Sequence, residues 1–187
     1  MTIKLEANHL KTISILFAYF CILALAFYYL KPGYLIWPIL ILSAVAWLFI
    51  EFKKSKNNLK ILKKALTLGI FLMLFDFIVE NIGAYLNLWT AVQTTIFHVI
   101  AVPIEVMLVC IIGGAAWAMA QPKKPMLSNE FLDIIFFAFF GALGEYTLIQ
   151  NNAMQYFTFW NSILAFTGYI ITWAILHLAW HKIFSKQ

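Results

Sequence analysis

The sequence is poor in charge and has no arginine at all. Charged residues make up 11% of its 187 residues and hydrophobic residues 64%, and all 13 basic residues are lysine. A soluble domain carries about a quarter charged residues, because its surface must meet water. The mean hydropathy of +0.87 points the same way. These values exclude a separate soluble domain and predict one membrane domain, which we expect in the cell membrane.

Cysteine and the common cofactor motifs are also scarce. The two cysteines, Cys21 and Cys110, both lie inside apolar runs, so they indicate neither a disulfide nor a metal site. The chain contains no H-E-x-x-H zinc motif, no phosphate-binding loop, no dinucleotide fingerprint and no serine nucleophile elbow. We therefore expect no metal and no cofactor.

Six apolar runs are present instead, and each approaches the roughly 20 residues that a helix needs to cross a bilayer. They predict an all-α, polytopic bundle of six transmembrane helices in a single domain, at residues 13–30, 35–50, 65–86, 91–120, 131–149 and 158–184. The first run resembles a signal peptide. It continues apolar to Leu30, however, which favours an uncleaved helix.

The lysines are distributed unequally between the two sides of this predicted bundle. Lys31 falls on one side, and twelve fall on the other: Lys4, Lys11, Lys53, Lys54, Lys56, Lys60, Lys63, Lys64, Lys123, Lys124, Lys182 and Lys186. Lysine accumulates in cytoplasmic loops, so both termini are predicted to be cytoplasmic. The lysine-rich stretch 51–64 is expected to meet anionic lipid headgroups rather than nucleic acid.

Acidic residues inside the spans are the main functional signal. Asp76, Glu80, Glu105 and Glu145 lie within predicted helices, where a charge costs at least roughly 2.5–3.5 kcal/mol. Asp76 and Glu80 are four residues apart and share one helix face. His98 and Glu105, seven apart, are predicted to share a face of the 91–120 helix. Together these residues predict a polar cavity in the half of the bundle that faces away from the cytoplasm.

Proline and glycine suggest how the helices bend and pack. Pro103 is expected to kink the 91–120 helix, because proline removes a backbone donor. Gly69, Gly83, Gly141 and Gly144 are expected to allow close helix approach.

Other polar groups have plainer interpretations. Asn161 and Thr172 can simply hold helices together by hydrogen bonds. His177 and His181 are interpreted as interfacial residues at the cytoplasmic end. The buried acids can themselves be hydrogen-bonded structural partners with no chemistry of their own.

Two stretches resemble a known family. Asp76-Phe-Ile-Val-Glu80-Asn-Ile-Gly83-Ala-Tyr85 followed by Val102-Pro103-Ile104-Glu105 resembles the membrane-embedded lycopene cyclase domain, and Glu80-x-x-Gly83 is similar to carotenoid hydratases. Tyr85 stands where that family has Trp, and Val106 where it has a second Glu. Glu145-Tyr146 with Tyr156 and Trp160-Asn161 is similar to a family of small uncharacterised bacterial multi-pass membrane proteins, which implies no activity.

The cyclase resemblance implies protonation of an alkene in an isoprenoid, carotenoid-like lipid, followed by ring closure or capture of the carbocation. Burial disfavours the charged form of a carboxyl, so some of these acids are expected to hold a proton at neutral pH. The residues assigned to catalysis are Glu105, Glu80 and Asp76. The residues expected to line the substrate are His98, Tyr85, Trp89, Glu145, Trp160 and Asn161.

Three other functions fit the same sequence: a capture subunit of a small-molecule importer, a proton-coupled transporter and a non-catalytic membrane scaffold. The eight glycines are few for a capture subunit, and no inverted repeat of the kind that many carriers have is evident. The expected partner is a membrane lipid or another apolar small molecule. The sequence leaves open whether the chain is an enzyme and whether it forms a homo-oligomer.

Overall fold

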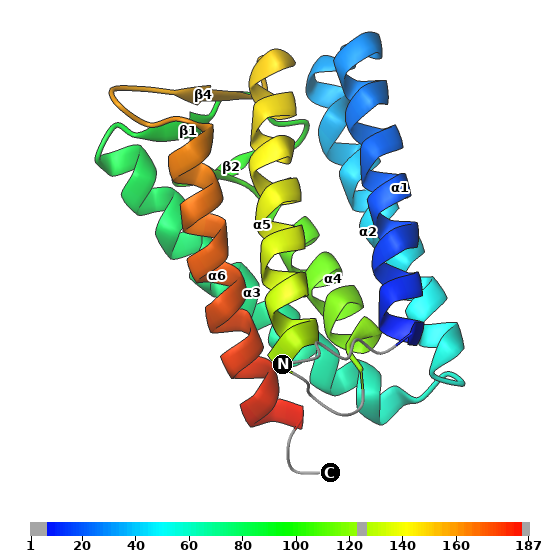
Figure 1. Cartoon of the computed structure of the whole chain (residues 1–187). Coiled ribbons are helices and arrows are strands. Elements are labelled where there is room, and N and C mark those ends of the chain that lie inside the picture. Colours follow the sequence, from blue (N-terminus) through cyan, green and yellow to red (C-terminus); the bar gives the residue numbers. More distant parts are fainter. Residues whose placement is uncertain (1–6, 123–126, 185–187) are drawn as a thin grey trace.

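The computed structural model describes residues 7–122 and 127–184. Within these ranges the chain is an up-and-down bundle (Figure 1). Its helices are α1 (Ala7–Leu30), α2 (Ile36–Lys54), α3 (Leu59–Tyr85), α4 (Ile104–Ala120), α5 (Leu127–Gln150) and α6 (Ser162–Phe184), and a short 3₁₀ turn, η1 (Gly33–Leu35), precedes α2. Four short strands complete it: β1 (Trp89–Ala91), β2 (His98–Val99), β3 (Val102–Pro103) and β4 (Met154–Tyr156).

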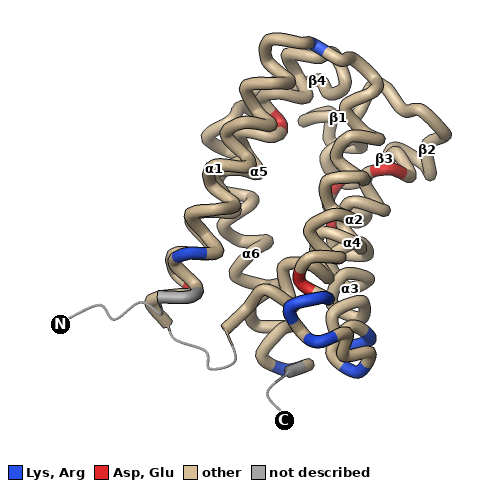
Figure 2. Tube along the Cα trace, turned by 90° about the vertical axis from the view of Figure 1, so that its right-hand side faces the viewer, with Lys and Arg blue, Asp and Glu red and all other residues tan. Residues whose placement is uncertain are grey.

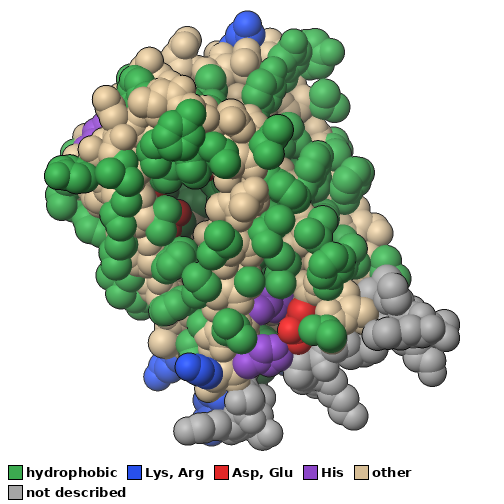
Figure 3. Space-filling model, turned by 60° about the vertical axis from the view of Figure 1, so that its left-hand side comes forward, with side chains coloured by type: hydrophobic (Ala, Val, Ile, Leu, Met, Phe, Trp, Pro, Cys, Tyr) green, Lys and Arg blue, Asp and Glu red, His purple; other side chains and the backbone are tan. Residues whose placement is uncertain are grey.

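Five helical segments of the described chain are long and apolar enough to cross a membrane, namely His9–Leu30, Gly33–Lys54, Leu59–Tyr85, Leu127–Gln150 and Ser162–Ile183. Helix α4 is apolar too but has 17 residues. The face of the bundle shown in Figure 3 carries apolar side chains over most of its height. These features are those of a helical, multi-pass membrane protein.

The helices form two layers of three. Helix α4 packs between α2 and α3, and α5 packs between α1 and α6, with fewer contacts from one layer to the other (Figure 2). Glycine permits the closest approach within a layer: a Cβ at Gly69 of α3 would lie 2.1 Å from the carbonyl oxygen of Ile111 in α4. Gly83 and Gly141 likewise face aromatic rings closely, whereas a Cβ at Gly144 would meet nothing within 4 Å. The expected close helix approach is thus confirmed at Gly69, against α4, and at Gly141, against the Tyr169 ring of α6. Gly83 instead makes room for Trp89 of β1, and the expectation is wrong at Gly144.

The expected helix over 91–120 is wrong in its first third. Residues 92–97 and 100–101 form loops around β2 and β3, and Ile100 has a positive φ of 59°. Because proline disfavours helical geometry in the residue before it, the helix begins only after Pro103. Pro103 therefore starts α4 instead of kinking it, and His98 does not share a helix face with Glu105.

A two-stranded ladder closes one end of the bundle. β1, from the α3–α4 connection, pairs antiparallel with β4, from the α5–α6 connection, with Trp89 opposite Tyr156 and Ala91 opposite Met154. The ladder joins the two layers, because α3 and α4 belong to one layer and α5 and α6 to the other.

The charges of the bundle are separated along its length. Eight described lysines lie at or near the end away from the ladder, while Lys31 lies at the ladder end (Figure 2). Helix α3 begins at the lysine-rich end, where the Asn58 side chain accepts hydrogen bonds from the backbone N–H groups of Lys60 and Ile61. Lys4, Lys123, Lys124 and Lys186 lie outside the described residues.

Candidate functional site

A cavity of about 320 Å³ lies between the two layers, beneath the β1–β4 ladder. All six α-helices contribute to its wall, and Ala91 and Met154 of the ladder line its end. Three carboxyl groups face it: Asp76 and Glu80 from α3, and Glu145 from α5. In Figure 3 an acidic side chain is visible inside a hollow among apolar side chains. The structure thus brings together three of the acids that the sequence singles out.

Glu80 is held by a tryptophan of the ladder. The indole Nε1 of Trp89 donates a hydrogen bond of 2.9 Å to Oε2 of Glu80. Gly83, one helical turn further along α3, makes room for this indole, because a Cβ there would lie 2.3 Å from the ring. The Trp160 ring packs against the Trp89 ring, with 4.3 Å between their centroids. Glu80 therefore has one fixed donor and one oxygen free of protein donors among the hydrogen bonds described.

Glu145 is held from the opposite strand of the ladder. The Tyr156 hydroxyl donates to Oε2 of Glu145 in a short hydrogen bond, and the hydroxyl of Tyr169 in α6 also bonds this carboxyl. Burial, and then the neighbouring Glu145 carboxylate, raise the pKa of Tyr156 above its ordinary value, so the phenol keeps its proton and remains a donor. Since Trp89 and Tyr156 are opposite each other in the ladder, one pair of strands positions two cavity carboxyls.

Asp76 lies one turn below Glu80 on the same face of α3, as their spacing predicts. It is hydrogen-bonded by the thiol of Cys110 in α4. Asp76, Glu80 and Glu145 are close enough to interact electrostatically. Three interacting carboxyls therefore face one largely apolar space.

Aromatic side chains form much of the remaining wall, namely Phe20, Phe27, Trp37, Trp47, Phe137, Phe140, Tyr169 and Trp173. The faces of such rings attract positive charge. Two of them, Trp47 and Trp173, have buried indole N–H groups with no partner among the described residues. The cavity therefore offers an apolar interior, ring faces, carboxyls at one end and two unused donors.

Glu105 is buried but does not line this cavity. Its Oε2 accepts a 2.6 Å hydrogen bond from the Thr94 hydroxyl. Its Oε1 accepts from the backbone N–H groups of Thr95, at 2.6 Å, and Ile96, at 3.0 Å, and also from the Thr95 hydroxyl. Every one of these partners is a donor to the carboxylate. The Glu105 carboxylate therefore holds the 94–96 loop against the start of α4.

The other residues assigned to the substrate lie around the cavity rather than in its wall. His98 is half-buried in β2, opposite Pro103. Tyr85 is 88% exposed at the end of α3. Asn161 is exposed, and its Oδ1 accepts from the N–H groups of Ile163 and Leu164, so it caps α6. Trp89 reaches the site through its hydrogen bond to Glu80, and Trp160 through its ring contact with Trp89.

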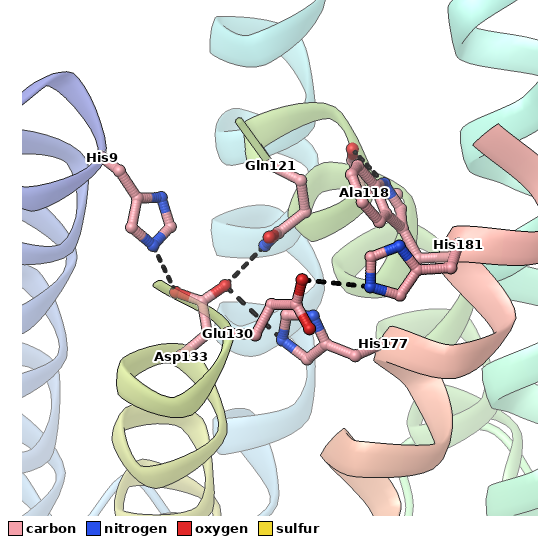
Figure 4. A network of polar contacts seen from close by, with 8 residues as sticks. His9, Ala118, Gln121, Glu130, Asp133, His177 and His181 are labelled. Carbon is pink, nitrogen blue, oxygen red and sulfur yellow. Dashed lines mark hydrogen bonds and ion pairs between the residues drawn. The ribbon is translucent and has the colours of Figure 1, made fainter. Parts of the chain in front are cut away.

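A second polar cluster lies at the lysine-rich end of the bundle (Figure 4). Asp133 of α5 lies 2.8 Å from Nε2 of His9 and 3.8 Å from Nε2 of His177, and its Oδ2 accepts a 2.6 Å hydrogen bond from Gln121. Glu130 lies 3.0 Å from Nε2 of His181. The cluster ties α1, the end of α4, α5 and α6 together. No group of ligands able to hold a metal occurs among the described residues.

The interpretation of His177 and His181 as interfacial residues misses this cluster, since His177 is 3% exposed. A signal for it exists in the sequence. Glu130 and Asp133 are three apart at the start of one helix, and the two histidines are four apart at the end of the next, on the same predicted side. His9 carries no such local pattern.

Comparisons of the chain with protein-family models, with curated proteins and with solved structures gave no match. Nothing in them bears on the resemblance to lycopene cyclases. The function of the cavity must therefore be inferred from its geometry and chemistry.

Proposed function

We propose that the protein binds an apolar, isoprenoid-like lipid in the central cavity and catalyses its cyclisation or hydration by acid. The observation that supports this proposal is the convergence of Asp76, Glu80 and Glu145 on one cavity whose remaining wall is apolar and aromatic. A protonated carboxyl in a dry pocket is a general acid. An apolar pocket of about 320 Å³ lies within the size range of small-molecule sites.

The proposed reaction begins with a proton on Glu80 or Asp76. The carboxyl O–H bond breaks, a C–H bond forms at one carbon of an alkene, and the positive charge develops on the other alkene carbon. A neighbouring double bond attacks this cation and closes a ring, after which loss of a proton to a carboxylate completes an isomerisation. If a water molecule attacks the cation instead and then loses a proton, the alkene is hydrated. The aromatic faces of the wall stabilise the cation.

Glu80 is the preferred donor within this proposal, and Asp76 is the residue from which it is reprotonated. Glu80 has one oxygen fixed by Trp89 and therefore a defined orientation. Glu145 is engaged by two phenols and suits the role of the carboxylate that receives the final proton. Glu105, which the resemblance assigns to catalysis, has no place in this step because its oxygens are occupied and it lies outside the cavity wall.

The test is mass spectrometry of total lipid extracts from cells that express the wild type, Glu80→Gln, Asp76→Asn or Glu105→Gln at equal levels in the membrane. We expect a lipid species that depends on the wild-type protein, disappears with Glu80→Gln and Asp76→Asn, and persists with Glu105→Gln. Glu105→Gln is the matched control, since it makes the same chemical change at a buried carboxyl outside the cavity. Identical extracts from wild-type and empty-vector cells would refute an enzymatic role for these lipids.

A capture or carrier function is the second candidate. It is favoured by the two unpartnered indole N–H groups of Trp47 and Trp173, which can donate to a polar group on a bound molecule. Mass spectrometry of the purified protein tests this function. A molecule that copurifies unchanged with the wild type, and is lost when Gly144→Leu fills the cavity, would establish it instead. The leucine would enter open space, because a Cβ at Gly144 meets no atom within 4 Å.

We also propose that the protein lies in the cell membrane with the lysine-rich end and both termini in the cytoplasm. The end-to-end separation of the described lysines supports this orientation. The exposed lysines of the 53–64 segment would then contact anionic headgroups. Reporter fusions at both termini test the orientation: cytoplasmic reporters should be active at both ends, and an external reporter at either end would contradict it.

A further inference from the structure

A second apolar space adjoins the central cavity. It has a volume of about 300 Å³ and lies between α1 and α2, with α4 behind it. Six residues line both spaces: Phe20, Leu23, Leu40, Trp47, Val109 and Gly113. The two spaces are therefore neighbours; we call the second space the α1–α2 groove and the two together the passage.

The α1–α2 groove extends the cavity towards the lysine-rich end. On α2 the central cavity begins at Ile36 and the groove ends at Lys54. At about 1.5 Å per residue these 18 positions span about 27 Å, close to the roughly 30 Å thickness of the hydrocarbon core. On α1 the wall runs from Phe27 to Thr12 in the opposite direction, as expected of an antiparallel neighbour.

Polar groups are distributed unequally along this passage. The three cavity carboxyls lie near one end, beneath the ladder, and Glu51 with Lys54 lies at the other, joined by a 2.7 Å ion pair. Between them the wall is mostly apolar or aromatic, and the hydroxyls of Tyr19, Ser43 and Thr172 are exceptions. Gly113 lies where the two spaces meet, and a Cβ there would meet no atom within 4 Å.

We propose that the α1–α2 groove holds the distal part of a long, linear apolar chain whose reacting alkene lies beside Asp76 and Glu80. The substrate is thus a chain about as long as the hydrocarbon core is thick, and short isoprenoids fill the central cavity alone. The placement of the reacting end rests on the proposed function, but occupancy of the groove does not. The occupant is the rest of the same molecule, because the groove is apolar, adjoins the cavity at six shared residues and has open space beside Gly113 at their junction.

The test measures equilibrium binding of radiolabelled squalene, as the long chain, and farnesol, as the short one, to the protein in lipid nanodiscs. Gly113→Leu places a side chain in open space at the junction of the two spaces. Ala46→Phe adds bulk at an exposed position that lines only the groove. For Ala46→Phe we expect squalene to bind about tenfold more weakly, a difference of about 1.4 kcal/mol, with farnesol binding unchanged. Gly113 also lines the central cavity, so for Gly113→Leu we expect squalene to lose more affinity than farnesol.

Matched controls separate this effect from damage to the bundle. Val45→Phe makes a comparable change one residue along α2, at an exposed position outside both linings. Gly168→Leu adds a leucine at a position that lines neither space and where a Cβ also meets nothing within 4 Å. Both controls should bind the two ligands as the wild type does.

The outcomes distinguish the inference from the proposed function. Wild-type squalene binding by Gly113→Leu and Ala46→Phe would overturn the inference, and so would equal loss of both ligands. Binding is measured in the Glu80→Gln background as well, where no turnover is expected. Suppose that the groove variants still bind squalene more weakly than farnesol there, and that wild-type and empty-vector cells have identical lipids. These results would refute the proposed chemistry and leave the assignment of the groove standing.

Discussion

Substitutions at Glu105 test whether this buried acid supports the structure or performs chemistry. Its carboxylate accepts four hydrogen bonds from Thr94, Thr95 and Ile96, two of them from backbone N–H groups. Glu105→Gln can keep its amide oxygen facing both backbone donors. Its new NH₂ group would then face the Thr94 hydroxyl, which can accept this bond and turn its own hydrogen towards the carbonyl of Phe97, 3.5 Å away. The glutamine therefore preserves the connectivity and loses only the charge.

The two substitutions Glu105→Gln and Glu105→Leu should differ in cost. Hydrogen bonds to charged groups contribute about 1.5–3 kcal/mol and neutral ones about 0.5–1.5, so losing the charge is expected to cost about 1–2 kcal/mol after partial relaxation. Leucine removes the acceptors altogether. It leaves two backbone N–H groups without a protein partner, at about 1–3 kcal/mol each, and we expect a total of about 2–6 kcal/mol.

The assay is thermal unfolding of purified protein in detergent, followed by size-exclusion chromatography, together with the lipid product in cells. Glu105→Leu should lower the midpoint at least twice as far as Glu105→Gln, and Glu105→Gln should retain the product. Glu80→Gln is the contrast, because it should lose the product with a smaller change in midpoint. A Glu105→Gln protein that unfolds like the wild type but makes no product would refute the structural role and restore Glu105 as a catalytic residue.

Three further substitutions test other contacts. Trp89→Phe keeps a ring against Gly83 but removes the donor to Glu80, so product formation should fall while the unfolding midpoint drops by the equivalent of about 1.5–3 kcal/mol at most. Gly69→Val should force α3 and α4 apart and cost about 1–3 kcal/mol or more, measured by thermal unfolding, and an unchanged midpoint would contradict the close approach. Asp133→Ala removes a buried acid from between two histidines and should lower the free energy of unfolding by about 3–5 kcal/mol, while the cavity carboxyls stay intact. A variant that binds squalene and unfolds like the wild type would show that the cluster does not hold the bundle.

The sequence predicts the helices well where length and hydropathy decide the outcome. The apolar runs at 13–30, 35–50, 65–86, 131–149 and 158–184 all fall on helices of the structure, with ends that differ by a few residues. The run at 91–120 differs because mean hydropathy overlooks Thr94 and Thr95. These side chains favour hydrogen bonds with nearby loop groups, and Pro103 prevents the preceding residue from adopting helical geometry.

The candidate site is predictable only in part, for a related reason. Asp76 and Glu80 share a face of one long helix, so their common destination follows from the helical period. Glu105 lies outside the cavity that these two acids line, bound to Thr94, Thr95 and Ile96. Predicting this requires the correct start of α4, because a helix begun at residue 91 gives Glu105 the wrong partners. The donors Trp89 and Tyr156 come from strands that pair across about 65 positions of sequence, and no local pattern announces that pairing.

The cluster around Asp133 is harder still to predict, because its contacts are remote in the sequence. His9 and Asp133 come from the first and fifth helices, and each residue alone resembles an ordinary polar group near a helix end. Their proximity depends on how α1 packs against α5. Periodicity describes one helix at a time and cannot supply that arrangement.

The two polar arrangements together bear on how an apolar substrate would reach the cavity. At one end the β1–β4 ladder joins the layers and places Ala91 and Met154 over the cavity. At the other end the cluster around Asp133 joins α1, α4, α5 and α6. Both ends are thus linked by hydrogen bonds and ion pairs, which are costly to open, whereas the α1–α2 edge between the layers is lined by apolar side chains. On the proposed function, we therefore expect the substrate to pass from the bilayer between α1 and α2.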